Sequence, residues 1–218
     1  MKSNEMGDEV KDRPTAQRMP PVSILAGGRS RRMGADKALV DFQGEPLVRR
    51  VVDRALAFAA PVSLVLHRAQ LADQRYRALA EQTGVRLLAD DYDHLGPLGG
   101  LSTALRHHAD WPAVLVLSCD MPCLTTELLE ILALRHAASA AEATIAMTAD
   151  GVRQPLPGVY ATSLIKVVSG LIAADQLRFD QLFGLVRTTI IPYDDPSNPR
   201  LFANLNTRDE LDEAAGPG

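Results

Sequence analysis

Residues 113–117 read Ala-Val-Leu-Val-Leu, an uninterrupted apolar run with no polar residue at alternate positions. Such a run is typical of an interior strand in a parallel sheet, where both faces of the strand are buried. On either side of it, short β-rich segments alternate with longer segments of helical periodicity. We expect strands at 22–26, 62–66, 85–89, 113–118 and 143–147, and helices at 46–59, 71–82, 99–109 and 124–138. This alternation predicts an α/β fold built on a doubly wound, mostly parallel sheet.

The chain has room for one such domain. At 218 residues and 46% hydrophobic composition it can form one substantial core. The first 20 residues are polar and charged and lead into Met-Pro-Pro at 19–21, which predicts a flexible N-terminal tail over 1–20. We therefore expect a single Rossmann-like domain over 21–218.

The pattern loosens after residue 150, which indicates an added subregion of the same domain. Its expected elements are a strand at 158–161, helices at 162–173 and 178–185, a strand at 188–192 and a last helix at 207–214 capped by Thr207.

Composition and charge exclude several functional classes. A formal net charge of −4 leaves no basic surplus for a general nucleic-acid binder. The first 20 residues hold no apolar run suited to a signal peptide, and no segment reaches the roughly 18 apolar residues of a membrane span. The only cysteines, Cys119 and Cys123, are spaced poorly for a zinc site, so we interpret both as structural thiols. We expect a soluble, cytoplasmic protein that binds neither nucleic acid nor membrane.

The segment 24–37, Ile-Leu-Ala-Gly-Gly-Arg-Ser-Arg-Arg-Met-Gly-Ala-Asp-Lys, joins an apolar strand to a loop rich in glycine and cations. Glycines let backbone N–H groups approach an anion closely, and Arg29, Arg31, Arg32 and Lys37 add positive charge. The spacing matches neither a P-loop nor a dinucleotide-binding fingerprint. A basic surface turn is the simplest alternative, but this combination directly after a strand favours a triphosphate-binding loop.

Acidic residues follow two other expected strands. Asp90 comes directly after the strand at 85–89, and Asp120 follows the apolar run at 113–117. Because carboxyl ends of parallel strands meet at one edge, we expect the cationic loop, Asp90 and Asp120 to share a rim. Asp120 suits Mg²⁺, which prefers oxygen ligands, although capping of the next helix is an alternative. For Asp90, capping, solvation and nucleotide contact all remain open.

A second glycine-containing turn, Leu-Gly-Pro-Leu-Gly-Gly-Leu-Ser at 95–102, leads into a helix, and its backbone is suited to line a base or phosphate pocket. His107 and His108 fall near the end of that helix. There the helix dipole favours positive charge, so we expect a solvated C-terminal face.

Several motifs together form a family pattern: Leu-Ala-Gly-Gly-Arg-Ser-Arg-Arg-Met-Gly-Ala-Asp-Lys at 25–37, Gly-Glu-Pro-Leu at 44–47, Gly-Pro-Leu-Gly-Gly at 96–100, Cys-Asp-Met-Pro at 119–122 and Asn-Leu-Asn-Thr at 204–207. With these motifs the chain resembles the nucleotidyltransferases of the molybdopterin guanine dinucleotide pathway, most closely the molybdenum cofactor guanylyltransferases. The resemblance runs from Val22 to Leu211. Arg-Arg-Met-Gly followed by Asp-Lys points to the molybdopterin branch rather than to the sugar nucleotidyltransferases. The Gly-Pro-Leu turn favours guanine over cytosine.

The resemblance implies a nucleotidyltransferase-type fold and roles for individual residues. Those it assigns to GTP are Leu25, Ala26, Gly27, Gly28, Lys37, Asp90 and Asp120. Those it assigns to the pterin substrate are Arg32, Arg178, Asn204 and Asn206. It implies that Asp120 holds Mg²⁺ and that Arg32, Lys37 and Asp120 form the catalytic set.

Two departures from the family pattern affect these assignments. Val65 stands where the family often has an asparagine that contacts the nucleotide, so this contact is absent or made by a neighbour such as His67 or Arg68. Gln154-Pro155-Leu156 stands where a His-Pro-Thr type segment is common. The second departure concerns the pterin side of the site.

The implied activity is transfer of GMP from GTP to the terminal phosphate of molybdopterin, with Mg²⁺ as cofactor and release of pyrophosphate. The attacking phosphate is already anionic, so the reaction needs positioning more than a general base. Implied protein partners are other proteins of cofactor biosynthesis and molybdoenzyme chaperones. The alternatives are cytidylyl transfer to molybdopterin, nucleotidyl transfer to a sugar phosphate, and non-catalytic carriage of the finished cofactor.

Overall fold

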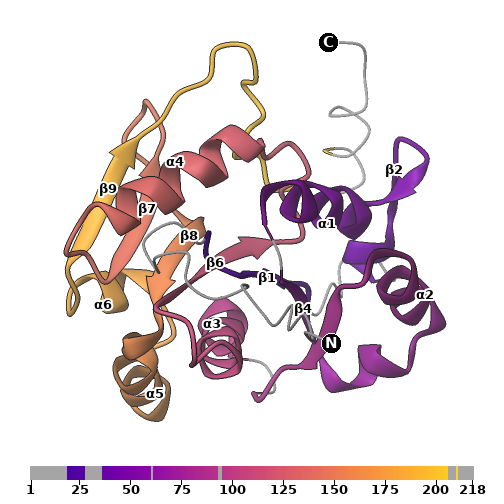
Figure 1. The fold of residues 1–218 in the computed structure, drawn as a ribbon, viewed down its shortest axis with the longest axis horizontal. Coiled ribbons are helices and arrows are strands. Elements are labelled where there is room, and N and C mark those ends of the chain that lie inside the picture. Colours follow the sequence, from indigo (N-terminus) through magenta and orange to yellow (C-terminus); the bar gives the residue numbers. More distant parts are fainter. Residues whose placement is uncertain (1–18, 28–35, 60, 93–94, 206–209, 211–218) are drawn as a thin grey trace, which may run out of the picture.

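The structure, a computed structural model, describes residues 19–27, 36–59, 61–92, 95–205 and 210. One seven-stranded sheet has the order β5-β4-β1-β6-β8-β7-β9, with helices on both faces (Figure 1). Its strands are β1 (Val22–Leu25), β4 (Val62–Leu66), β5 (Arg86–Ala89), β6 (Ala113–Ser118), β7 (Ala143–Met147), β8 (Arg153–Ala161) and β9 (Thr188–Pro192). Neighbouring strands run parallel except where β8 pairs with β6 and β7. The expected mostly parallel α/β sheet is confirmed.

Strand β6 shows why its apolar run lacks alternation. Leu115 and Leu117 pack into a core on one face of the sheet. Val114 and Val116 pack into a second core on the other face. Since both faces are buried, every position of the strand is apolar until Ser118 at its carboxyl end.

Six α-helices make up the described helical layers. Residues of α1 (Leu47–Phe58), α2 (Gln74–Thr83) and α4 (Thr126–Ala137) join the core that contains Leu115. Residues of α3 (Gly96–His107), α5 (Ile165–Ala173) and α6 (Phe179–Phe183) join the core that contains Val114. Figure 1 shows α1 and α4 on one side of the sheet and α3 and α5 on the other.

Local capping chemistry sets several helix boundaries. Thr125 accepts from the Leu128 N–H at 3.4 Å and begins α4, so Asp120 does not cap this helix. Asp73 begins α2 by accepting from the Arg75 N–H at 2.9 Å, and Gly84 ends it in the left-handed conformation at φ +74°. The helix expected at 71–82 is therefore split, with a 3₁₀ helix at Arg68–Ala72 before α2.

Three further features differ from the sequence prediction. The strand expected at 158–161 begins at Arg153 and runs antiparallel to its neighbours. The helix expected at 162–173 begins with a 3₁₀ turn, Thr162–Leu164, before α5. A small hairpin, β2 (Asp41–Phe42) and β3 (Glu45–Pro46), was not predicted; positive φ at Gln43 and Gly44 forms its turn.

Strand order reverses around β1, which lies between β4 and β6. From β1 the chain goes outward to β4 and β5 and then returns to β6 on the opposite side. Ligands of open α/β sheets bind beyond the carboxyl ends of the strands at such a switch point. None of the described helices is both long and apolar enough to span a lipid bilayer.

Candidate active site

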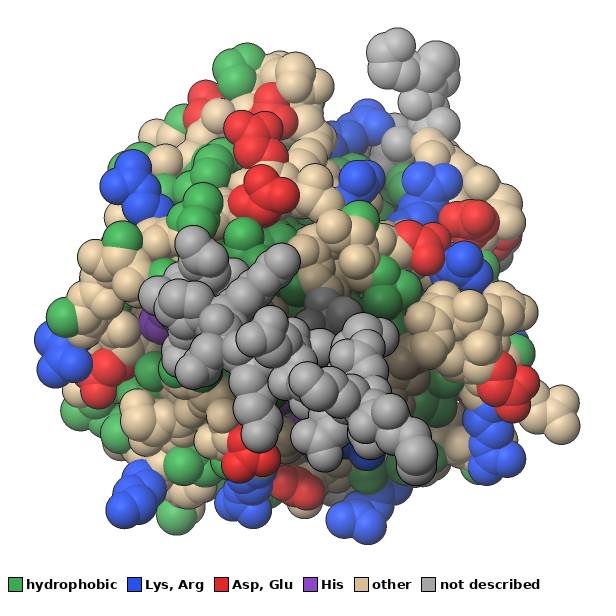
Figure 2. Space-filling view, in the orientation of Figure 1, with side chains coloured by type: hydrophobic (Ala, Val, Ile, Leu, Met, Phe, Trp, Pro, Cys, Tyr) green, Lys and Arg blue, Asp and Glu red, His purple; other side chains and the backbone are tan. Residues whose placement is uncertain are grey.

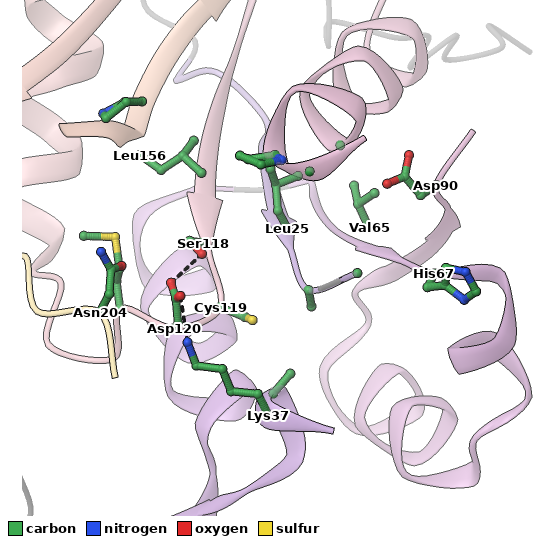
Figure 3. A pocket seen from close by; sticks show the side chains of 18 of the residues that line it. Leu25, Lys37, Val65, His67, Asp90, Ser118, Cys119, Asp120, Leu156 and Asn204 are labelled. Carbon is green, nitrogen blue, oxygen red and sulfur yellow. Dashed lines mark hydrogen bonds and ion pairs between the residues drawn. The ribbon is translucent and has the colours of Figure 1, made fainter. Parts of the chain in front are cut away.

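A cavity of about 870 Å³ lies at this switch point. The residues that end or follow the central strands line it, and Figure 3 shows their side chains converging from both sides. They include Leu25, Ala26, Gly27, Asp36, Lys37, Val65, His67, Asp90, Ser118, Cys119, Asp120, Met121 and Asn204. The structure therefore brings the described end of the cationic loop, Asp90 and Asp120 to one rim, as the sequence predicts.

Lys37 and Asp120 form an ion pair in this cavity. Lys37 Nζ donates to Asp120 Oδ2 at 2.8 Å, and the Ser118 hydroxyl donates to Asp120 Oδ1 (Figure 3). Both side chains are mostly buried, with 14% of Lys37 and 20% of Asp120 exposed. Lys37 opens a 3₁₀ helix, Lys37–Leu39, whose first turn is capped by the Asp36 carboxylate. A cation and an anion are thus held side by side at the carboxyl end of β6.

Asp90 is oriented by helix α3. Its Oδ1 accepts from the Thr103 hydroxyl at 2.8 Å and from the Tyr92 N–H at 3.2 Å. A Cβ added at Gly27 would lie 3.1 Å from His67 N and 3.9 Å from Asp90 Oδ2. The backbone after β1 therefore passes close to both residues, and a side chain at position 27 would be in tight contact with the backbone of His67.

Helix α3 also closes tightly over the end of β1. A Cβ at Gly100 would lie 2.9 Å from Leu25 Cδ2, and both residues line the cavity. The predicted turn at 95–102 thus contributes through the first residues of a helix, which begins at Gly96 with Pro97 in its first turn.

Asp120 offers the chemistry of one protein ligand to a hard divalent cation. Among the described residues, no group of three or more His, Cys, Asp or Glu side chains is arranged to hold a metal ion. Mg²⁺ usually takes only one or two carboxylates and completes its shell with water and substrate phosphates. The single carboxylate therefore fits a metal that arrives with a triphosphate, and Mg²⁺ binding by Asp120 stays a prediction.

Comparison with known proteins identifies the family. The MobA-like NTP transferase domain matches residues 22–182, most of the chain. The chain belongs to this MobA-like NTP transferase family. It is 32% identical over 190 residues to a probable molybdenum cofactor guanylyltransferase of Flavobacterium johnsoniae, covering 87% of this chain and 93% of that protein. It is 31% identical to a molybdenum cofactor guanylyltransferase of Shewanella amazonensis, over 87% of this chain and 92% of that protein.

Solved structures agree on the fold. Molybdopterin-guanine dinucleotide biosynthesis protein A from Archaeoglobus fulgidus superposes with a TM-score of 0.75 at 23% identity, over 89% of this chain and 96% of that one. The family match and the curated relatives together show that this MobA-like protein is an enzyme, a nucleotidyltransferase.

The far side of the cavity in this MobA-like transferase contains residues expected to contact the second substrate. Asn204 lines the cavity, and the next residue, Leu205, donates its N–H to the Asp120 carbonyl at 3.0 Å. Gln154, Pro155 and Leu156 of β8 line it as well, so the segment that departs from the family pattern is part of the site.

Arg178 lies elsewhere. Its side chain is 81% exposed, pairs with Asp180 at 3.6 Å and does not line the cavity, although the adjacent Phe179 does. The structure therefore does not bring Arg178 together with Asn204, and its role toward the pterin stays a prediction. Gly28, Arg32 and Asn206, together with Arg29, Arg31 and Thr207, lie outside the described residues.

The prediction of a solvated face at His107 and His108 is wrong for His108. This side chain is 4% exposed, and its Nε2 lies 3.3 Å from the Ser63 hydroxyl. Burial lowers the pKa of His108 to about 4, with smaller contributions from His107 and Arg86. The last turn of α3 packs against the first residues of β4, which sequence periodicity alone does not indicate.

Both cysteines fit a structural interpretation. Cys119 is buried, and burial raises the pKa of its thiol. Cys123 is partly buried, and burial raises its pKa also. A thiol whose pKa is raised is a poor nucleophile at neutral pH.

Sequence reasoning did not single out Ser118 or Tyr92 as site residues. Ser118 is the polar residue that ends the apolar run of β6, a signal that was available because strand ends form the rim. Tyr92 lies in the turn after β5, and no local pattern distinguishes it from a surface residue.

Proposed function

We propose that this protein transfers GMP from GTP to the terminal phosphate of molybdopterin, forming molybdopterin guanine dinucleotide and releasing pyrophosphate. The observation that carries the proposal is the Lys37–Asp120 pair in one cavity that also holds Asp90 and Asn204. Relatives that share about a third of its residues are named for this reaction.

The cavity supports separate places for the two substrates. His67 and Asp90 lie on one side of the Lys37–Asp120 pair, and Asn204 lies on the other (Figure 3). The proposal assigns the His67 side to the guanine nucleoside and the Asn204 side to molybdopterin. The triphosphate then lies between them, beside Lys37.

In the proposed reaction, an oxygen of the molybdopterin phosphate attacks the α-phosphorus of GTP. The new phosphoanhydride bond forms as the bond between the α-phosphorus and the bridging oxygen breaks, and pyrophosphate leaves. Lys37 offsets repulsion between the two anions and stabilises negative charge on the transferring group. Asp120 and Ser118 hold Lys37 at the reaction centre, and Asp90 orients the nucleotide. No general base is required, because the nucleophile is ionised at neutral pH.

Mg²⁺ fits the proposal as a cofactor held by Asp120 and the substrate phosphates. When bound, it would neutralise charge on the triphosphate and on the departing pyrophosphate.

The test is pyrophosphate release from GTP and from CTP, with Mg²⁺, in the presence and absence of molybdopterin. We expect release that requires molybdopterin and strongly prefers GTP. A preference for CTP would instead indicate cytidylyl transfer. Absence of release with either nucleotide would reject the transfer to molybdopterin and favour carriage of the finished cofactor or another acceptor, such as a sugar phosphate.

A further inference from the structure

The side-chain amide of Gln70 connects the two ends of the glycine-rich loop. Gln70 lies in the 3₁₀ helix Arg68–Ala72 that follows β4. Its Nε2 donates to the Ala26 carbonyl at 3.1 Å, before the loop, and to Asp36 Oδ2 at 2.7 Å, after the loop. Its Oε1 accepts from the His67 N–H at 2.8 Å. One side chain thus joins the end of β1, the end of β4 and the residue before Lys37.

Tyr76 also binds the carboxylate of Asp36. This tyrosine of α2 is fully buried, and its hydroxyl donates to Asp36 Oδ2 at 2.9 Å. Burial, reinforced by the negative charge of Asp36, raises the pKa of Tyr76, so the hydroxyl stays protonated and remains a donor. Asp36 Oδ2 therefore receives two hydrogen bonds from side chains that belong to other elements.

The other oxygen of Asp36 acts on the segment that carries Lys37. Asp36 Oδ1 accepts from the Ala38 N–H at 3.2 Å and caps the 3₁₀ helix Lys37–Leu39. This helix starts at Lys37, whose Nζ reaches Asp120. Asp36 thus links Gln70 and Tyr76 to Lys37, the cation of the active site.

We propose that Gln70 and Tyr76 are positioning residues that act through Asp36 to hold Lys37 at the triphosphate. The proposal rests on the function proposed above for Lys37. A lysine has a flexible four-carbon stem, so its backbone must be fixed if the ammonium is to be placed accurately. The hydrogen bonds from Gln70 and from the buried Tyr76 to Asp36 supply that rigidity, and phosphoryl transfer depends on accurate positioning.

A double-mutant cycle tests this mechanism. Gln70→Ala and Tyr76→Phe are each made alone and together with Lys37→Ala. For each variant, kcat and KM for GTP are measured with Mg²⁺ and molybdopterin, and Kd for GTP is measured by calorimetry. We expect Gln70→Ala and Tyr76→Phe each to lower kcat/KM about tenfold in the wild-type protein. In the Lys37→Ala background the same substitutions should lower kcat/KM very little. The same coupling is expected in Kd.

The controls separate positioning from a general loss of structure. Tyr76→Phe removes one oxygen atom and keeps the buried ring, and the thermal midpoint of each variant is recorded. Gln82→Ala removes a glutamine of α2. In the part of the chain that the structure describes, its side-chain carbonyl accepts one hydrogen bond, from Arg49 at 3.2 Å, so this variant should retain wild-type kinetics. The proposal would be overturned if the effects of Gln70→Ala or Tyr76→Phe and of Lys37→Ala on kcat/KM were fully additive. It would also be overturned if Gln70→Ala and Tyr76→Phe left the kinetics unchanged.

The binding cycle also distinguishes this inference from the proposed function. Because GTP binding needs no acceptor, coupling between Gln70 and Lys37 in Kd supports the positioning network even if the wild-type protein fails to transfer GMP to molybdopterin. That failure would reject only the proposed reaction. Transfer by the wild type without coupling to Gln70 would reject only the network.

Discussion

Asp120 accepts hydrogen bonds on both carboxylate oxygens, from Lys37 on Oδ2 and from Ser118 on Oδ1. A metal ion that binds this carboxylate must therefore share it with Lys37 or displace the ammonium. A triphosphate brings new acceptors for that ammonium, so nucleotide and metal binding should support each other at this residue.

We predict that Asp120→Ala loses at least about 100-fold in kcat/KM for GTP, because a charged group in the centre of the site is removed. Lys37→Ala should show a loss of similar size. The measurement is pyrophosphate release over a range of Mg²⁺ concentrations. Asp53→Ala is the matched control, since it removes an aspartate from an exposed ion pair with Arg49 on α1. Near-normal turnover by Asp120→Ala would contradict the assignment.

At the scale of elements, two glycines mark close contacts with different consequences. Gly100 brings α3 against β1, where an added Cβ would meet Leu25 Cδ2, the mobile end of a side chain. Gly158 lies in β8, where an added Cβ would be 2.5 Å from the Pro155 carbonyl oxygen and 2.9 Å from Tyr160 Cε2. Backbone and a buried ring cannot move aside as a methyl group can.

We predict that Gly158→Ala lowers the free energy of unfolding by about 1 to 3 kcal/mol through overpacking. Gly100→Ala should change stability by less than about 1 kcal/mol, because alanine favours the helix and Leu25 can rotate. Leu25 would then enter the cavity and raise KM for GTP about fivefold. Denaturant unfolding and GTP kinetics of both variants test the contrast. Equal losses of stability would show that Leu25 does not move.

At the scale of the whole molecule, α3 runs from the site, at the carboxyl ends of the strands, to the amino ends of β1 and β4. Its first turns line the cavity through Gly96 and Gly100, and its C-terminal end places His108 against Ser63 at the start of β4. Ser63 in turn lies 2.8 Å from the Ser23 hydroxyl of β1. A buried polar cluster therefore anchors α3 at the end remote from the substrates.

His108 should make stability depend on pH. Its pKa is about 4 in the folded protein and 6.5 as an ordinary value, so between these values the unfolded chain binds more protons. The free energy of unfolding should then fall as pH drops from 6.5 to 4, by at most about 2 to 3 kcal/mol. Denaturant unfolding at several pH values checks this. His108→Gln cannot titrate, so its curve should be flatter; parallel curves would refute the assignment.

Much of the fold follows from local sequence. The strands at 62–66, 113–118, 143–147 and 188–192 were predicted with the bounds that the structure shows, because long apolar β-rich runs leave few alternatives. The shared rim also follows, since parallel strands end at one edge. That topology brings Lys37, Asp90 and Asp120 into one cavity, while their chemical roles stay predictions.

The remaining features depend on contacts between residues far apart in the chain. The sequence does not show that β8 reverses direction, that His108 is buried against Ser63, or that Arg178 pairs with Asp180 outside the cavity. Nor does it show that Gln70 joins Ala26 to Asp36. Residue types and local periodicity determined the α/β class and the candidates Lys37, Asp90 and Asp120, because those depend on near neighbours and on strand ends. The family resemblance supplied the other candidates, Asn204 and Arg178 among them. Tertiary packing alone decided which polar groups meet, since hydrogen bonds require atoms within about 3 Å.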